Sequence, residues 1–224
     1  MMNDRVLQPV ETGRQESVLA SNRVLRNTYA LLAMTLLFSA AVAGGAMALE
    51  LPHPGLILTL IGYFGLLYLV YRLKDSGQGV LAVFALTGFM GYTLGPIISH
   101  YLSLPNGGQI VMVALGSTGL AFVGLSAYAL TTKRDLTGMG SFLFVGMLVA
   151  FVMGLVAVLF SMPALSLAVA GMFALLSCGL ILYETNNIVR GGETNYIMAT
   201  VSLFVSLYNL FLSLLQLLGL GGSD

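Results

Sequence analysis

The sequence predicts an all-α polytopic membrane protein with seven transmembrane helices. Of its 224 residues, 58% are hydrophobic and only 8% are charged, and the mean hydropathy is +0.94. Soluble domains carry roughly 25% charged residues, so the chain is far too apolar to be one. The second observation is a series of apolar stretches, each near the roughly 20 residues that a helix needs to cross a bilayer. The third is that all nine basic residues fall on one side of such a bundle.

Proline, glycine and polar residues separate the apolar stretches. The run from Leu136 to Tyr183 holds 48 uncharged residues, more than twice one span, and Pro163 is expected to divide it because proline suits the first turn of a helix. Gly191 and Gly192 should end the sixth helix, as glycine does at C-terminal caps. The expected helices lie at about 28–49, 54–72, 79–102, 109–131, 138–160, 164–189 and 196–219, within a transmembrane domain of residues 28–220.

The basic residues predict the orientation of the chain. They occur before the first helix, between helices two and three, between four and five, and between six and seven, while the other connections and the C-terminus have none. Positive residues mark the cytoplasmic side, so the N-terminus should be cytoplasmic and the short tail 221–224 should lie on the other side. The nine residues are Arg5, Arg14, Arg23, Arg26, Arg72, Lys74, Lys133, Arg134 and Arg190.

Residues 1–27 precede the first apolar stretch. Seven of them are charged and they show no hydrophobic periodicity. We therefore expect a flexible cytoplasmic tail, which could extend up to about 90 Å. Its basic residues Arg5, Arg14, Arg23 and Arg26 are candidate partner-binding residues.

The composition excludes several classes of function. The net charge is zero, so nucleic-acid binding has no electrostatic basis. Cys178 is the only cysteine, and His53 and His100 lie far apart, so neither a disulfide within the chain nor a metal site is expected. No serine in the spans has a base partner, so we expect no catalytic residues, no cofactor and no enzyme activity.

Glu184 is the only charged residue between Asp135 and Arg190. A carboxylate within a span costs about 3 kcal/mol on insertion scales, and such residues usually face the bundle interior or a water-filled cavity. This favours a functional site. The alternative is an interfacial position, because Glu184 lies only six residues before Arg190, about 9 Å of helix rise.

The seventh helix has a face of small or polar residues from end to end. Such a face cannot lie against lipid. It either packs through interhelical hydrogen bonds or lines a hydrated pathway, and both interpretations stay open. The face consists of Asn195, Ala199, Ser202, Ser206, Asn209, Ser213 and Gln216, at alternating spacings of four and three.

The sixth helix presents Ala170, Ser177 and Glu184 at heptad spacing, again on one face. Counted inward from the short loop after Val189, Glu184 is level with Ser202 or Ser206. If the two faces meet, Glu184 gains hydroxyl or amide partners.

Small residues spaced four apart indicate close helix contacts within a compact bundle, because they let backbones approach in lipid. Three sets show this spacing: Gly91 and Gly95; Gly146, Ala150 and Gly154; and Ala40, Gly44 and Ala48.

Seven segments between about residue 22 and the end carry the motifs of a known family. They are Val24–Tyr29, Pro54–Leu60, Leu94–Ile97, Leu130–Asp135, Tyr183–Ile188, Gly191–Tyr196 and Ser206–Phe211. These segments resemble the Bax inhibitor/YccA family, most closely its proteobacterial YccA branch. The order of several long motifs makes chance similarity improbable.

The resemblance implies a seven-helix fold with helix seven at its centre and six helices around it. It also implies a multi-pass protein of the bacterial inner membrane, with a periplasmic C-terminus. Two functional themes follow from it: association with the membrane-anchored AAA protease FtsH, as substrate and modulator, and a pH-sensitive calcium leak. The leak uses paired acidic residues on helices six and seven.

The family's site residues map unevenly onto this chain. Glu184 matches the acidic position on helix six, but Ser206 occupies the second acidic position, so one carboxylate of the pair is missing. One carboxylate alone cannot give the sharp proton response of two. Arg72 lies near the position where the family has a basic residue closing the site. The candidate ion- or proton-sensing residues are Glu184, Ser206, Ser202, Asn209 and Arg72.

The first interpretation is therefore a non-enzymatic inner-membrane protein that binds and modulates FtsH. Its partners would be the FtsH complex and the lipid bilayer. The alternative is a proton-coupled calcium or cation leak that uses Glu184, and Ser206 weakens it.

Overall fold

The computed structural model describes the backbone of residues 8–221 and the side chains of residues 22–219. Within these residues the protein is almost entirely helical, with no strand, and seven helices are long and apolar enough to cross a membrane. The helices are α1 (Gln8–Ala48), α2 (Leu56–Leu73), α3 (Gln78–Leu102), α4 (Gly107–Thr131), α5 (Gly140–Leu159), α6 (Pro163–Val189) and α7 (Tyr196–Gly221), with a short 3-10 turn, η1 (Thr137–Met139), before α5. The all-α, seven-span prediction is confirmed.

Six helices begin and end within two residues of the predicted limits. The exception is α1, which begins at Gln8 rather than near residue 28, although its membrane-spanning part is Asn22–Ala48. Part of the segment expected to be a flexible tail is therefore helical. Residues 8–21 include two glutamates, two glutamines, Arg14, Leu19 and Ala20, which favour helix, and Pro9 falls in the first turn, where proline is tolerated. Residues 1–7 and 222–224 lie outside the described residues.

Helix α6 begins and ends at the proline and glycine that were predicted to bound it. Pro163 is its first residue, and Gly191 follows its last turn with φ +76°, a left-handed conformation that glycine adopts without a steric penalty. The N–H of Gly192 donates to the carbonyl of Asn187 at 2.9 Å, and that of Gly191 to the carbonyl of Ile188 at 3.1 Å. This pair of bonds satisfies carbonyls left free at the end of a helix and turns the chain into α7.

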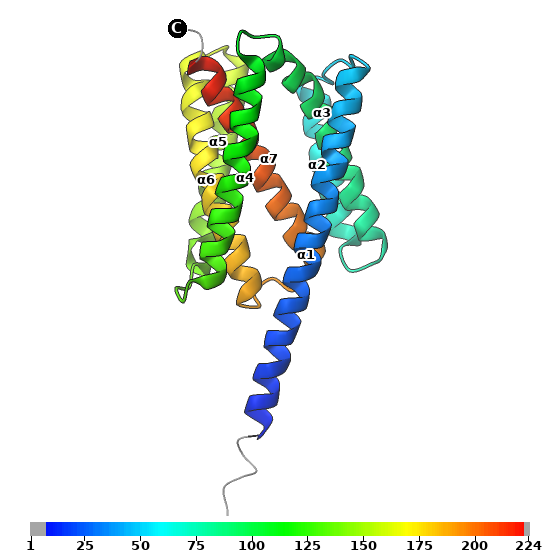
Figure 1. Ribbon diagram of the computed structural model, residues 1–224, viewed down its shortest axis with the longest axis vertical. Coiled ribbons are helices and arrows are strands. Elements are labelled where there is room, and N and C mark those ends of the chain that lie inside the picture. Colours follow the sequence, from blue (N-terminus) through cyan, green and yellow to red (C-terminus); the bar gives the residue numbers. More distant parts are fainter. Residues whose placement is uncertain (1–7, 222–224) are drawn as a thin grey trace, which may run out of the picture.

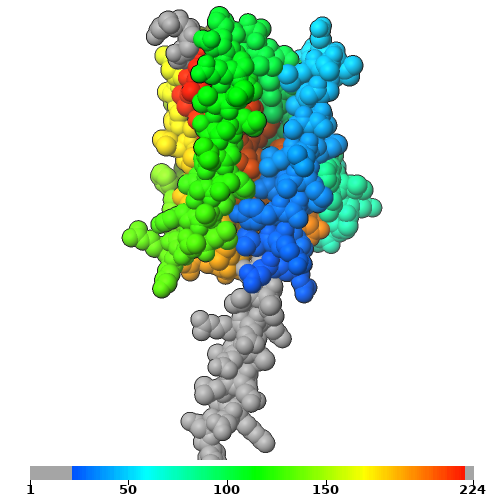
Figure 2. All heavy atoms as spheres, in the orientation of Figure 1, coloured from blue at the N-terminus to red at the C-terminus, as the bar shows by residue number. Residues whose placement is uncertain are grey.

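Helix α7 crosses the middle of the bundle (Figure 1). It packs against α1, α2, α3, α4 and α6, and in the described part of the chain only α5 lacks direct backbone packing with it, because α6 lies between them. Both faces of α7 are buried: Ala199 and Ser206 on the polar face, and Leu203 and Phe204 on the apolar face. In the space-filling view the outer helices cover most of α7, which shows as red beside α4 and as dark orange between α4 and α1 (Figure 2).

The outer helices expose large apolar side chains, as expected where lipid replaces water. Helix α2 exposes Ile57, Ile61 and Tyr68, and α5 exposes Phe142 and Phe144. Only a small part of the α2 and α5 spans is buried, compared with half of the α3 and α7 spans. Helix α2 is therefore the most peripheral element of the bundle, followed by α4 and α5, whose spans are buried to the same small extent.

Two of the predicted small-residue faces form close helix contacts. A Cβ added at Gly91 would collide with the backbone carbonyl of Ser39 on α1, and one at Gly146 would lie 2.7 Å from Leu176 on α6. The third prediction was wrong: Ala40, Gly44 and Ala48 are exposed, and nothing lies within 4 Å of a Cβ at Gly44. The face of α1 that meets α3 carries Ser39, Ala43 and Ala46 instead. Both faces are rich in small residues, so composition alone did not distinguish them.

Candidate functional site

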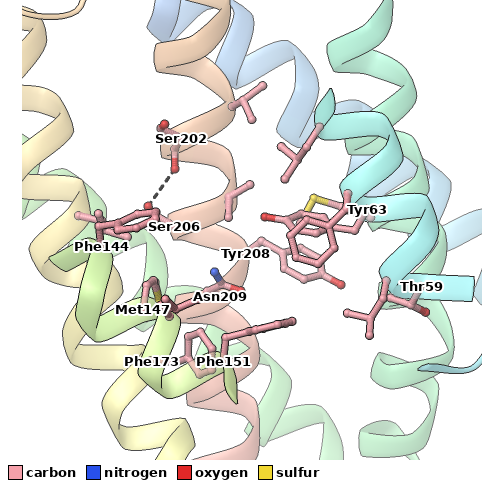
Figure 3. Close-up of a pocket in the computed structure, with 18 of the residues that line it drawn as sticks. Thr59, Tyr63, Phe144, Met147, Phe151, Phe173, Ser202, Ser206, Tyr208 and Asn209 are labelled. Carbon is pink, nitrogen blue, oxygen red and sulfur yellow. Dashed lines mark hydrogen bonds between the residues drawn. The ribbon is translucent and has the colours of Figure 1, made fainter. Parts of the chain in front are cut away.

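A cavity of about 570 Å³ lies between α2, α3, α5, α6 and α7. Helix α7 supplies its polar wall, with Ser202, Ser206 and Asn209 (Figure 3). Side chains from α2 lie on the opposite side, and aromatic and methionine side chains from α5 and α6 line its apolar wall. Its size is within the range of about 300–1,000 Å³ that is typical of small-molecule sites.

Glu184 lines this cavity from α6. The Ser202 hydroxyl is a polar group that interacts with the Glu184 carboxyl. The charged group that acts on the Glu184 carboxyl is the carboxylate of Glu193. Glu184 is only partly exposed, and no described basic side chain forms an ion pair with it. The structure therefore agrees with a cavity-facing carboxylate rather than one that reaches toward headgroups and a basic partner.

The polar face of α7 divides into a middle and two ends. In the middle, Ser202, Ser206 and Asn209 line the cavity, and the Ser206 hydroxyl donates to the Ser202 carbonyl at 2.9 Å. Among the described residues the Asn209 side chain has no hydrogen-bond partner, so its amide is available to the cavity. Toward the C-terminal end the Gln216 amide donates to the Ser166 hydroxyl of α6 at 2.5 Å. The C-terminal end of this face therefore packs through a hydrogen bond between helices, whereas its middle borders the cavity.

The N-terminal end of the α7 polar face is structural as well. The side-chain oxygen of Asn195 accepts from the N–H groups of Ile197 and Met198 at 3.0 and 3.2 Å, which caps α7. Its amide donates to the Lys74 carbonyl at 3.0 Å and to the Asp75 carboxylate at 2.9 Å. Asn195 thus attaches the α2–α3 loop to the start of α7.

Asn186, to which no sequence pattern assigned a role, is buried near the end of α6. Its side-chain oxygen accepts from the Leu136 N–H at 3.0 Å and from Arg190 Nε at 3.1 Å, and its amide donates to the Arg134 carbonyl at 3.4 Å. Arg190 in turn donates from Nη2 to the Lys133 carbonyl at 2.8 Å. The α4–α5 loop is therefore attached to the end of α6. The signal that could have indicated this is the run of four polar residues, Glu184 to Asn187, inside an apolar span.

Asp135 belongs to the same loop. The pKa of its carboxyl is lowered from the ordinary value of 3.8, mainly because the Thr137 hydroxyl and then the Thr137 N–H donate to it, with a smaller contribution from the nearby charge of Arg190. The two hydrogen bonds measure 2.6 and 2.9 Å, and Arg190 Nε lies 3.8 Å from Oδ1.

Arg72 is not part of the cavity. It lies exposed in the last turn of α2, it does not line the cavity, and no ion pair joins it to Glu184 in the described structure. The structure therefore does not bring Arg72 to the cavity. Helix α2 lines the cavity with residues nearer its middle, among them Tyr63, two and a half turns before Arg72.

The basic residues of the described loops lie at one end of the bundle, which we call the basic end. It comprises the α2–α3, α4–α5 and α6–α7 loops and the entry of α1 (Figure 1). Arg23 and Arg26 are exposed there. Arg5 lies outside the described residues and the Arg14 side chain lies outside the described side chains, so neither can be placed.

The cavity offers one carboxylate, several hydroxyls and an amide against an apolar wall. Among the described side chains no group of three histidine, cysteine or acidic residues could hold a metal ion. The arrangement can bind a cation or a proton through Glu184, and it can accommodate an apolar ligand.

The fold and the cavity define a polytopic seven-helix membrane protein with an acidic residue inside its membrane-spanning part. A family model described as inhibitor of apoptosis-promoting Bax1 matches residues 21–223. The chain belongs to the Bax inhibitor family, which confirms the resemblance seen in the sequence.

The chain is similar along most of its length to several bacterial proteins. It is 51% identical over 209 residues to the "Modulator of FtsH protease YccA" of Escherichia coli strain K12, covering 93% of this chain and 94% of the relative. It is also 51% identical over 201 residues to an uncharacterised protein of Pseudomonas aeruginosa, covering 90% of each chain. A membrane protein of Vibrio cholerae is 41% identical over 210 residues, covering 93% of this chain and 94% of the relative.

Proposed function

We propose that this chain is a non-enzymatic inner-membrane protein that binds and modulates the FtsH protease. The observation that carries the proposal is the 51% identity, over nearly the whole of both chains, to a protein named as an FtsH modulator. A relative of the same identity and coverage from another Escherichia coli strain is named as an inner membrane protein. An identity this high over seven spans favours a shared partner as well as a shared fold.

The basic end is the proposed contact surface. Positive residues favour the cytoplasmic side of a membrane, so the charge distribution supports a cytoplasmic basic end and a periplasmic C-terminus. Helix α1 begins at Gln8, before its membrane-spanning part at Asn22, and projects beyond the loops at this end (Figure 1). Residues 8–21 correspond to about 20 Å of helix, which would extend into the cytoplasm.

Two asparagines give this surface a defined shape. Asn186 attaches the α4–α5 loop to α6, and Asn195 attaches the α2–α3 loop to α7. All three loops of the basic end are thereby connected through the α6–α7 segment. A preformed surface favours binding because little conformational freedom is lost on association.

The experiment is a pulldown of the intact protein from native membranes, together with a measurement of its FtsH-dependent half-life. Deletion of residues 2–20 removes the projecting part and leaves the span with Arg23 and Arg26, so insertion should be retained. We expect the deletion to reduce FtsH capture and to lengthen the half-life. Glu50→Gln, in the exposed loop at the opposite end, is the control and should change neither. Unchanged capture and half-life in the deletion would reject α1 as the contact. Absence of FtsH from the wild-type pulldown would reject the proposed partner.

A pH-sensitive cation leak is the second candidate, and one observation favours it: Glu184 shares a cavity with Ser202, Ser206 and Asn209. The position that would supply a second carboxylate on α7 is Ser206, so calcium has a single acidic ligand there, whereas calcium prefers six to eight oxygens with several carboxylates. Calcium flux into liposomes containing the purified protein tests this function. A steep pH-dependent flux in the wild type would place the leak first.

A further inference from the structure

The cavity has its mouth on the side that faces lipid, between α2 and α5. Phe64 of α2 and Phe144 and Leu148 of α5 all line the cavity, yet they are 50%, 69% and 53% exposed. In the described structure the backbones of α2 and α5 do not pack against each other. Their one ring contact is edge-to-face between Phe64 and Phe151, with centroids 5.9 Å apart. A ligand dissolved in the hydrocarbon can therefore enter by displacing aromatic side chains, without unfolding a helix contact.

The wall near this mouth is aromatic. Aromatic rings attract cations through their negative faces, by about 0.5–2 kcal/mol for each good contact, and more strongly where water is excluded. The rings come from α2, α3, α5, α6 and α7, so they surround the space rather than forming one side of it. They are Tyr63, Phe64, Phe89, Phe144, Phe151, Phe173 and Tyr208.

The charge of the cavity has the matching sign. Among the described residues that line the cavity, Glu184 is the one carboxylic acid, and none is a lysine, arginine or histidine. The other charge that acts on Glu184 is a second carboxylate, that of Glu193. Arg72 lies exposed at the end of α2, outside the cavity. A bound cation would therefore meet a carboxylate without competing with a resident basic side chain.

Polar and apolar side chains both line the cavity along its length. On α6 the lining residues extend from Phe173 to Glu184, which lie about 16 Å apart along the helix axis. On α7 they include Ser202 and Asn209, which lie about 10 Å apart along the helix axis. A small hydrated metal ion would face mostly apolar side chains over that length. An organic cation with apolar substituents would satisfy both the carboxylate and the aromatic wall.

We propose that this cavity is a binding site for lipophilic organic cations, which enter from the bilayer between α2 and α5 and place their charge against Glu184. The proposal does not depend on the interaction with FtsH, since it rests on the cavity alone. It assigns the seven rings a role in ligand binding rather than in packing only.

The test uses the full-length protein in nanodiscs, with radiolabelled tetraphenylphosphonium as the probe and empty nanodiscs to subtract partition into lipid. Tetraphenylborate, an anion of the same shape, is the matched probe. We expect saturable binding of one tetraphenylphosphonium per chain and no saturable binding of tetraphenylborate. Saturable binding of both ions with equal affinity, or of neither, would overturn the proposal, because the cavity would then be an apolar space without charge selection.

Two variants locate the site. Glu184→Gln keeps the size of the side chain and should weaken tetraphenylphosphonium binding by about tenfold, whereas the control Glu50→Gln should bind like the wild type. Phe151→Leu keeps an apolar side chain but removes a ring face, and should weaken binding by about threefold. Wild-type affinity in a folded Glu184→Gln would overturn the assignment. If that variant does not fold, wild-type affinity in Phe151→Leu would overturn it instead.

Discussion

Asn186 accepts a hydrogen bond at 3.0 Å from the backbone N–H of Leu136, a residue 50 positions earlier in the chain. Asn186 is only 1% exposed, and the same side chain also contacts Arg190 and the Arg134 carbonyl. One amide therefore satisfies backbone groups of the α4–α5 loop that would otherwise lie against α6 without partners. The loop takes its position from the end of α6, next to the turn that leads into α7.

Asn186→Leu should destabilise the protein by about 1–3 kcal/mol, because the Leu136 N–H and the Arg134 carbonyl lose their partner while a side chain of similar volume remains. The measurement is the free energy of unfolding in mixed micelles. Asn187→Leu is the control, since Asn187 is adjacent on α6 but its side chain forms none of the hydrogen bonds to the loop. Equal destabilisation by the two substitutions would show that Asn186 does not hold the loop.

Stability at acid pH should depend on Asp135. Its pKa is lowered in the folded protein, chiefly by the two hydrogen bonds from Thr137, so the folded state favours the ionised carboxyl. The resulting stabilisation is complete above the ordinary pKa of 3.8 and is lost as the pH falls through the lowered folded value. Wild type should be more stable than Asp135→Asn at neutral pH, and the difference should disappear on acidification through that range.

The matched variants for this pH test are at Thr137. Thr137→Val removes the hydroxyl donor and should reduce the acid-dependent difference, whereas Thr137→Ser keeps a hydroxyl and should preserve most of it. Asp135 is fully exposed, so the effect should be small and should decrease with added salt. A stability difference between wild type and Asp135→Asn that does not change with pH would contradict the role assigned to Asp135.

Gly91→Ala should weaken the contact between α1 and α3. The added Cβ would collide with the Ser39 carbonyl, which belongs to the backbone and cannot rotate away. Overpacking of this kind costs about 1–3 kcal/mol. Gly44→Ala is the control, because nothing lies within 4 Å of its Cβ and alanine favours helix over glycine. Thermal stability in detergent should fall for Gly91→Ala and stay equal or rise for Gly44→Ala; the reverse order would contradict the packing.

The helix limits were predictable because the thickness of the bilayer sets the length of each apolar run, and polar residues, proline or glycine follow where the run ends. Pro163 and Gly191 stand where α6 begins and ends. The start of α1 was not predictable from apolarity, since residues 8–21 are polar and their helix depends on backbone propensity rather than on burial. Which face of α1 meets α3 was also hidden, because Ser39 and Ala43 are as small as Ala40 and Gly44.

The polar side of the cavity was predictable and the apolar side was not. The spacing of Ser202, Ser206 and Asn209, together with the isolated charge of Glu184, indicated one face on each of two helices. The rings of α2 and α5 gave no such signal, because apolar residues in a membrane face lipid and neighbouring helices alike. Asn186 and Asn195 act through backbone groups of distant loops, and a polar residue in the sequence does not say which loop it will contact.

The last prediction concerns Ser206, which lines the same cavity as Glu184. Ser206→Asp would add a second carboxylate to the polar face of α7, and two carboxylates in one site cannot both ionise without a strong mutual penalty, so they should share a proton. When both are ionised they would offer several oxygen ligands to calcium, a hard cation. The variant should therefore show pH-dependent calcium flux in liposomes well above wild type.

The control is Ser206→Asn, which has the same size as Ser206→Asp but is neutral and should not show this flux. A folded Ser206→Asp without added flux would mean that the two side chains do not act on one ion, and a wild type that already conducts calcium with a steep pH response would show that Glu184 needs no second acid on α7.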